Sequence, residues 1–120
     1  MNDDYIGGDC GLNVQFKKGV LELCVLILIS KRDYYGFELG ESISKQIDIA
    51  EGTLYPLLRR LKGQNFLSTY QVDSTEGPSR KYYSMTDTGV KYMEDLLEEW
   101  NQFTGAIHNF IEGEMKREQK

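Results

Sequence analysis

The chain of 120 residues is poor in the residue types that metal binding, disulfide bonding and much catalysis require. It has two cysteines and one histidine, and its cysteines do not have the short spacing of a zinc site. Cys24 lies in an apolar segment and Cys10 in a polar leader, so we expect no disulfide between them. The sequence also has no cysteine–histidine pair suited to catalysis and no glycine-rich phosphate loop after a strand. We therefore predict neither an enzyme nor a protein that holds a metal or a cofactor.

Long hydrophobic runs are also missing. The longest apolar stretch, residues 20–29, is interrupted by Glu22 and flanked by lysines and arginines, so it is too short to span a bilayer. The N-terminus is acidic and rich in glycine, whereas a secretion signal is first basic and then apolar. These features predict a soluble, cytoplasmic protein without a membrane partner.

An excess of positive charge is missing as well, since the formal net charge is −5. This disfavours a nucleic-acid partner at first sight, because a protein binds DNA by neutralising phosphates with Lys and Arg. The charge is unevenly distributed, however. Residues 15–86 carry ten Lys or Arg against eight Asp or Glu, and residues 87–120 carry four against eight. DNA binding through the middle of the chain is compatible with this distribution if the acidic ends lie away from the DNA.

The apolar residues that are present predict three helices in the first half of the chain. Residues 15–32 are polar at both ends and apolar nearly all round in the middle, which indicates a buried helix, although Val and Ile leave a strand over residues 20–29 as an alternative. A second helix is expected from Phe37 to about Gln46. A third is expected over residues 53–64, and its buried side is formed by Leu54, Leu57, Leu58 and Leu61.

Pro56 constrains the start of the third helix. Proline lacks an amide hydrogen and is best tolerated in the first helical turn, so the helix is expected to begin near Gly52 or Thr53, with Thr53 as its N-cap.

Two short segments after the third helix predict a β-hairpin. Residues 66–72 and 80–85 are rich in Tyr, Val and Thr, and residues 73–79 are turn formers that suggest a long tip. Strand alternation directs a set of side chains toward the core, namely Leu67, Tyr70 or Val72, and Tyr83 or Met85. It leaves Arg80 and Lys81 near the tip.

The final helix has the most regular pattern in the chain. Thr86 is a suitable N-cap, with Asp87 favourable beside the positive end of the helix dipole. Apolar residues then follow at spacings of three and four, as in a coiled-coil seam. The predicted dimerisation residues are Met93, Leu96, Leu97, Trp100, Phe103, Ile107 and Phe110. The pattern predicts a homodimer, and the alternative is that this helix packs on the core of its own chain.

The order of helix, helix, helix and hairpin predicts a mostly α (α+β) winged helix-turn-helix with a long C-terminal dimerisation helix. The expected organisation is a disordered leader or expression remnant over residues 1–13, a winged-helix DNA-binding domain over 14–86, a dimerisation helix over 87–111 and a charged tail over 112–120. Fold alone does not fix function, so the site residues carry that argument.

Three blocks of sequence resemble the PadR-like transcriptional regulators. They are KGVLELCVLILIS with DYYGFEL, EGTLYPLLRRL at residues 51–61, and SRKYYSMTDTG at residues 79–89. The resemblance extends from Phe16 to Phe110 and implies a dimeric repressor that binds double-stranded DNA. Lys62 departs from the pattern, because family members commonly have an acidic residue there.

The resemblance places the DNA-binding surface on the third helix and the hairpin. The expected residues are Lys45, Gly52, Thr53, Tyr55, Arg59, Lys62, Arg80 and Lys81. Gly52 would allow a close backbone approach, and Thr53 and Tyr55 would reach a phosphate or a base edge. Arg60 is expected to face elsewhere. The competing interpretation is that the charged residues form only a solvated face and that Tyr55 belongs to the core.

Trp100 suggests a second site, because some relatives bind flat aromatic compounds between such residues of a dimer. The residues expected to contact a planar aromatic effector are Gln15, Phe16, Gly19, Trp100 and Phe103. Packing in the dimer core is the alternative role for Trp100. The alternative to a DNA-binding regulator is a winged-helix protein-interaction module without DNA binding, which the acidic composition favours.

Overall fold

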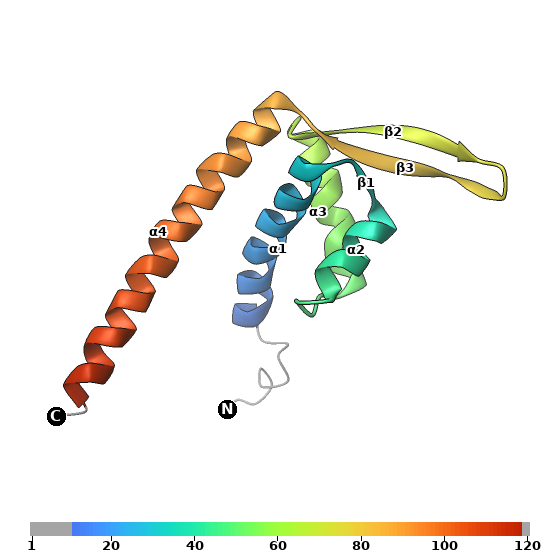
Figure 1. Ribbon diagram of the computed structural model, residues 1–120. Coiled ribbons are helices and arrows are strands. Elements are labelled where there is room, and N and C mark those ends of the chain that lie inside the picture. The colour runs from blue at the N-terminus through green and yellow to red at the C-terminus, as the bar shows by residue number, and fades with distance from the viewer. Residues whose placement is uncertain (1–10, 119–120) are drawn as a thin grey trace.

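A computed structural model describes the backbone of residues 11–118 and the side chains of residues 19–50 and 52–117. The elements are α1 (Gly11–Lys31), β1 (Tyr34–Tyr35), α2 (Gly36–Ser44), α3 (Glu51–Gly63), β2 (Leu67–Ser74), β3 (Gly77–Met85) and α4 (Asp87–Glu118). The strands form an antiparallel sheet in the order β1-β3-β2. Figure 1 shows α1, α2 and α3 gathered below the sheet, with the hairpin and α4 extending away from them in different directions. The architecture is the predicted winged helix-turn-helix with a long last helix.

The core forms around α1, which confirms the helix and rules out the strand alternative for residues 20–29. Leu21, Val25, Leu26 and Ile29 of α1 are buried against leucines of α2 and α3 and against residues of the sheet. Because α2, α3, the sheet and α4 all pack on α1, this helix is apolar nearly all round. Cys24 is a half-buried free thiol in this helix, and burial raises its pKa. Cys10 lies outside the described residues.

The helix boundaries differ from the prediction at two N-termini. α1 begins at Gly11, four residues before the expected start at Gln15. α3 begins at Glu51 with Ala50 as its N-cap, so the prediction of Thr53 as the cap is wrong. Pro56 therefore lies beyond the first turn. Its missing N–H would have bonded the carbonyl of Gly52, which is an exposed residue.

The hairpin is longer and its turn shorter than predicted. Ser74 pairs with Gly77, which leaves a two-residue turn at Thr75 and Glu76 and makes the predicted long tip wrong. An irregularity between Val72 and Ser74 shifts the register near the end of β2. Turn-forming residues such as Gly77 and Pro78 thus lie within a strand of a projecting ribbon.

The inward face of the hairpin is only partly as predicted. Leu67 and Tyr83 are buried, but Tyr70 and Val72 are 43% and 42% exposed, so their assignment to the core is wrong. Both lie on the sheet face that points away from the helices, where no other described element covers them.

The last helix begins as predicted. Thr86 caps it by accepting a hydrogen bond from the Gly89 N–H at 2.9 Å, and its own hydroxyl donates to the Asn65 carbonyl at 2.7 Å. Tyr92, Met93 and Leu96 pack against the core. Beyond them α4 diverges from α1 and continues to Glu118, past the expected end at residue 111. None of the helices in the described range has the length and hydrophobicity that a membrane span needs.

Candidate nucleic-acid interface

One face of α3 is anchored in the core and the other is open. Leu54, Leu58 and Leu61 are buried, and helical spacing places Tyr55, Arg59 and Lys62 on a different side. All three of these side chains are exposed, and Tyr55 is 44% exposed to solvent. The exposed side of α3 therefore presents one aromatic hydroxyl and two cations in a line.

Tyr55 is held in place by the first residue of α2. A Cβ at Gly36 would lie 2.7 Å from Cε1 of the Tyr55 ring, so any side chain there would displace the ring. The glycine in the DYYGFEL block thus permits α2 and the first half of α3 to approach each other closely. This contact fixes the direction of the Tyr55 side chain.

The neighbouring arginines of α3 point in different directions. Arg60 makes an ion pair with Glu22 of α1 at 3.3 Å and donates to Gln64 at 2.9 Å. Arg59 lies near Tyr83: burial and the nearby Tyr55 raise the pKa of Tyr83, and the positive charge of Arg59 opposes that rise. Arg59 is thus beside the base of the hairpin, and Arg60 faces α1, as expected.

The two hairpin cations project from opposite faces of the ribbon, because successive residues of a strand alternate. Lys81 shares its face with Tyr83, the face turned toward α3, and its cross-strand neighbour there is Gln71. Arg80 shares the other face with Tyr82, and its guanidinium lies 4.7 Å from the centre of the Tyr35 ring. The structure does not unite Arg80 and Lys81 in one patch.

A row of tyrosines that the sequence analysis missed crosses the outer face of the sheet. Tyr35, Tyr82 and Tyr70 stand directly opposite one another on β1, β3 and β2. Adjacent ring centres are 5.5 and 5.6 Å apart. The paired tyrosines in DYYG and RKYY, placed in strands, were the available signal, since alternation sends one member of each pair to each face.

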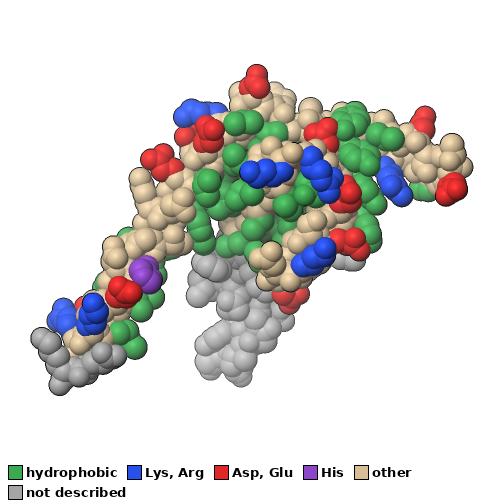
Figure 2. Space-filling view, in the orientation of Figure 1, with side chains coloured by type: hydrophobic (Ala, Val, Ile, Leu, Met, Phe, Trp, Pro, Cys, Tyr) green, Lys and Arg blue, Asp and Glu red, His purple; other side chains and the backbone are tan. Residues whose placement is uncertain are grey.

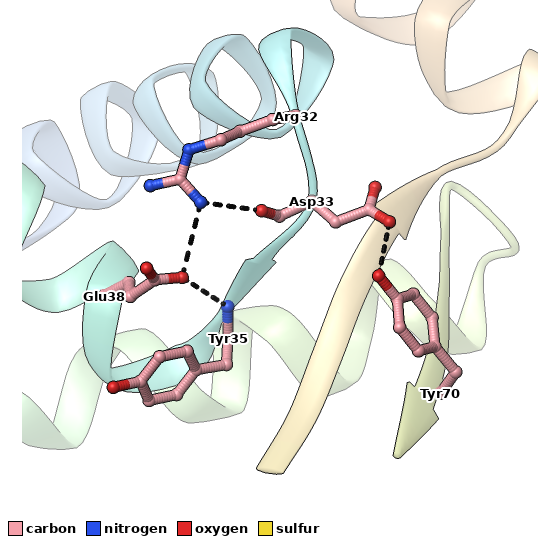
Figure 3. Close-up of polar contacts among 5 residues, drawn as sticks. All are labelled: Arg32, Asp33, Tyr35, Glu38 and Tyr70. Carbon is pink, nitrogen blue, oxygen red and sulfur yellow. Dashed lines mark hydrogen bonds and ion pairs between the residues drawn. The ribbon is translucent and has the colours of Figure 1, made fainter. Parts of the chain in front are cut away.

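Polar contacts fix the turn between α1 and α2 beside this row (Figure 3). Glu38 accepts hydrogen bonds from the Tyr35 N–H at 3.1 Å and from Arg32 at 3.4 Å. Asp33 accepts a hydrogen bond from the Tyr70 hydroxyl at 2.6 Å, and this bond is the main cause of the raised pKa of Tyr70. These contacts join β1 and the start of α2 to the hairpin.

The remaining predicted DNA-binding residues have mixed surroundings. Lys45 is exposed at the C-cap of α2, and Gly52 is exposed in the first turn of α3. Thr53 is half-buried and lines a cavity of about 550 Å³ between α1 and α3 together with Gly19 and Arg60. Thr53 is thus turned toward α1, unlike Tyr55.

A second cavity, of about 360 Å³, lies between α1 and α4. Its lining includes Gly19, Trp100 and Phe103, three of the residues expected to contact an effector. The side chains of Gln15 and Phe16, the other two, lie outside the described residues. Leu23, Leu96 and Glu99 also line this cavity, so the described part of its wall is mostly apolar with one carboxylate.

Comparisons with known proteins agree on one family. The family model described as "Transcriptional regulator PadR-like family" matches residues 25–95. A PadR-like transcriptional regulator of Bacillus cereus is 35% identical with a TM-score of 0.73, and the match covers 81% of this chain and 96% of that one. A protein of Streptococcus mutans is 36% identical with a TM-score of 0.74, covering 80% of this chain and 90% of that one. An uncharacterised protein of Lysinibacillus sphaericus is 35% identical over 80% of this chain and 92% of its own length.

Proposed function

The chain belongs to the PadR-like family of transcriptional regulators, and from this premise we propose that it is a homodimeric repressor that a small molecule releases from its operator. Proteins of this family are transcriptional regulators, so the chain is a DNA-binding regulator and not an enzyme. In the proposal, residues 14–86 bind DNA, residues 87–111 hold the dimer together, and the protein acts in the cytoplasm.

The observation that carries the DNA-binding proposal is the open face of α3. Tyr55, Arg59 and Lys62 lie along it at helical spacing, and the buried leucines on the other side fix its orientation. A helix in the major groove uses such residues for phosphate and base-edge contacts. Lys81 extends this surface onto the hairpin, on the sheet face that is turned toward α3. In α4, acidic residues outnumber basic ones, and this helix extends as a separate arm away from the other helices (Figure 1). DNA binding through α3 and the hairpin is therefore compatible with the negative net charge of the chain.

The far half of α4 supports the dimer. Every residue from 105 to 117 is exposed, and the apolar residues among them have no described element of this chain over them. From residue 103 onward, the exposed large apolar residues of α4 are Phe103, Ile107, Phe110, Ile111 and Met115. Figure 2 shows hydrophobic side chains exposed along this part of the helix. Monomeric proteins rarely leave such a stripe in water, and a second copy of the helix would cover it.

The cavity between α1 and α4 supports the effector. Trp100 and Phe103 offer aromatic surfaces, and Glu99 supplies a negative charge, which together suit a planar aromatic cation. Titration with such compounds is expected to quench the fluorescence of the single tryptophan. A panel of planar cations without any response would contradict this part of the proposal.

DNA binding by the intact chain is the decisive experiment. We expect a labelled duplex from upstream of the protein's own gene to bind at physiological salt with two chains per site, as measured by fluorescence anisotropy and sedimentation. The variant Arg59→Ala with Lys62→Ala should weaken binding to all duplexes, because it removes phosphate contacts. A stable monomer, or a dimer that binds no duplex, would instead indicate the protein-interaction module.

A further inference from the structure

Glu22 lies where α1, α3 and α4 meet. Its side chain is only 13% exposed. One of its oxygens, Oε2, accepts a hydrogen bond from the Tyr92 hydroxyl of α4 at 2.5 Å and faces Nη2 of Arg60 on α3 at 3.3 Å. A single carboxylate of α1 thus contacts both α4 and α3. A carboxylate with so little access to water is costly to bury unless it is paired. The contacts with Tyr92 and Arg60 together therefore compensate for the burial of Glu22.

Tyr92 is held at both ends. Its ring stacks on Phe66 with the ring centres 4.1 Å apart and the planes 5° from parallel. Phe66 lies shortly after the end of α3 at Gly63, and its N–H donates to the carbonyl of Leu61 at 3.0 Å. Burial and the bond to Glu22 raise the pKa of Tyr92, and the nearby Arg60 opposes the rise. The ring of Tyr92 is therefore packed against the segment that ends α3, and its hydroxyl is connected to Arg60 through Glu22.

The start of α4 is fixed to the end of α3 by further contacts. The hydroxyls of Thr86 and Thr88 both donate to the Asn65 carbonyl, at 2.7 and 2.9 Å. A Cβ at Gly89 would overlap the backbone of Phe66, so the two segments are in direct backbone contact. A tilt of α4 relative to α1 is therefore expected to move the end of α3 with it or to break the Tyr92–Glu22 bond.

The packing between α1 and α3 leaves room for such a movement. The cavity of about 550 Å³ beside Glu22 and Arg60 is lined by Gly19 on α1 and by Gly52 and Thr53 on α3. The side chains that the structure describes therefore do not fill the space between the two helices there. The Arg60–Glu22 ion pair borders this space and spans it from one helix to the other.

We propose that Glu22 is a positioning residue that couples the tilt of α4 to the orientation of α3. Binding of a partner chain or an effector at α4 would then alter the open face of α3. This inference rests on the proposed function, in which α3 reads DNA and α4 receives the partner and the effector. Arg60 adjoins Arg59 in α3, and a helix that moves as a unit carries all its side chains with it. A shift of Arg60 therefore moves Arg59, Lys62 and Tyr55 together.

The test uses variants that remove polar contacts and keep the packing. Tyr92→Phe retains the ring on Phe66 and loses only the hydroxyl, and Arg60→Gln removes the ion pair with Glu22 together with the hydrogen bond to Gln64. Each is expected to weaken operator binding by about 5- to 20-fold while the dimer persists. The double variant should be no weaker than the weaker single one, because both act through Glu22. Arg60→Lys should recover part of the affinity.

Tyr70→Phe is the matched control, since it also removes a tyrosine–carboxylate hydrogen bond, the one to Asp33 at 2.6 Å, but on the outer face of the sheet. We expect it to leave operator affinity unchanged. Hydrogen exchange supplies a readout that needs no DNA: Tyr92→Phe on α4 should speed exchange of the α3 amides, and Tyr70→Phe should not.

The two hypotheses fail in different ways. A wild-type chain that binds no duplex refutes the proposed function, and α3 exchange then decides the coupling alone. Operator affinity and α3 exchange that stay unchanged in Tyr92→Phe and Arg60→Gln, or losses that simply add in the double variant, overturn the role of Glu22.

Discussion

The winged-helix body and the far half of α4 differ in what holds them in shape. In the body, residues from α1, α2, α3 and the sheet form one buried cluster. In the far half of α4, from residue 105 to 117, every side chain is exposed, and the apolar ones face water. The body has a core of its own, whereas the far half of the arm has an apolar stripe without one. Such a contrast is expected of a domain that folds alone and carries an interface for a second copy.

The largest expected effect would test this contrast directly. Leu58 is fully buried, and Leu58→Ala should lower the free energy of unfolding by about 2–5 kcal/mol, because it leaves a cavity. Phe110 is 67% exposed within one chain, so Phe110→Ala should barely alter the stability of the body and should instead weaken self-association. Urea denaturation at fixed protein concentration and sedimentation equilibrium separate the two results. A large loss of body stability in Phe110→Ala without any change in association would contradict the division.

The junction between the two regions offers a matched pair of glycines. Gly89→Ala should destabilise the protein by about 1–3 kcal/mol, because its Cβ would meet the rigid backbone of Phe66. Gly105→Ala adds a Cβ into open space in the same helix and should stabilise it by about 0.4–1 kcal/mol. Thermal unfolding of both variants measures the difference. Equal changes in melting temperature would show that α4 is not fixed to Phe66.

The hairpin cations are expected to have a smaller effect, confined to DNA binding. Replacing Arg80 and Lys81 together by Ala should weaken binding to all sequences and flatten the dependence on salt by up to about two units per protomer. Lys81→Ala should account for the larger share, because Lys81 shares a sheet face with Tyr83 beside Arg59. The measurement is the slope of log affinity against log salt. An unchanged slope in the double variant would refute the phosphate role.

Alkaline pH should produce the smallest effect, and it should arise in the body. The pKa values of Tyr83 and Tyr92 are raised above their ordinary value of 10.0, chiefly by burial. The folded protein therefore holds these protons more tightly than the unfolded chain. Their contribution to stability is complete below pH 10 and is lost as the pH rises through the raised values. Tyr92→Phe should shrink the loss of stability that denaturation curves show as the pH rises above 10.0. A loss as large as in the wild type would contradict the role of Tyr92.

The sequence predicted elements well where the signal is local and periodic. The leucines of the third helix, the Thr86 cap and the order of elements are all as expected, because they follow from helical spacing and cap chemistry. The prediction of Thr53 as a cap failed because Pro56 is tolerated one turn later than the rule suggests. The prediction of a long hairpin tip failed because turn-forming residues such as Gly77 and Pro78 lie within strand β3.

Of the candidate site, the sequence predicted the exposure of Tyr55, Arg59 and Lys62, and only the structure showed that Thr53 is half-buried and turned toward α1. The sequence predicted that Arg80 and Lys81 both bind DNA, but strand alternation places them on opposite faces of the hairpin. β1 is only two residues long and exists because Tyr34 and Tyr35 pair with Tyr83 and Tyr82 far along the chain. Such a short strand has no local signature.

The sequence by itself determined which side of each helix is apolar, because covalent geometry and helical or strand period fix how side chains succeed one another along a chain. It thereby determined the fold and the apolar stripe of α4, and three blocks of its sequence indicated the family. Only the tertiary structure decided which polar groups meet. Glu22 accepts a hydrogen bond from Tyr92, which lies 70 residues away, and forms an ion pair with Arg60. A pairing of this kind depends on three helices crossing at one point, and no spacing within the chain encodes that crossing.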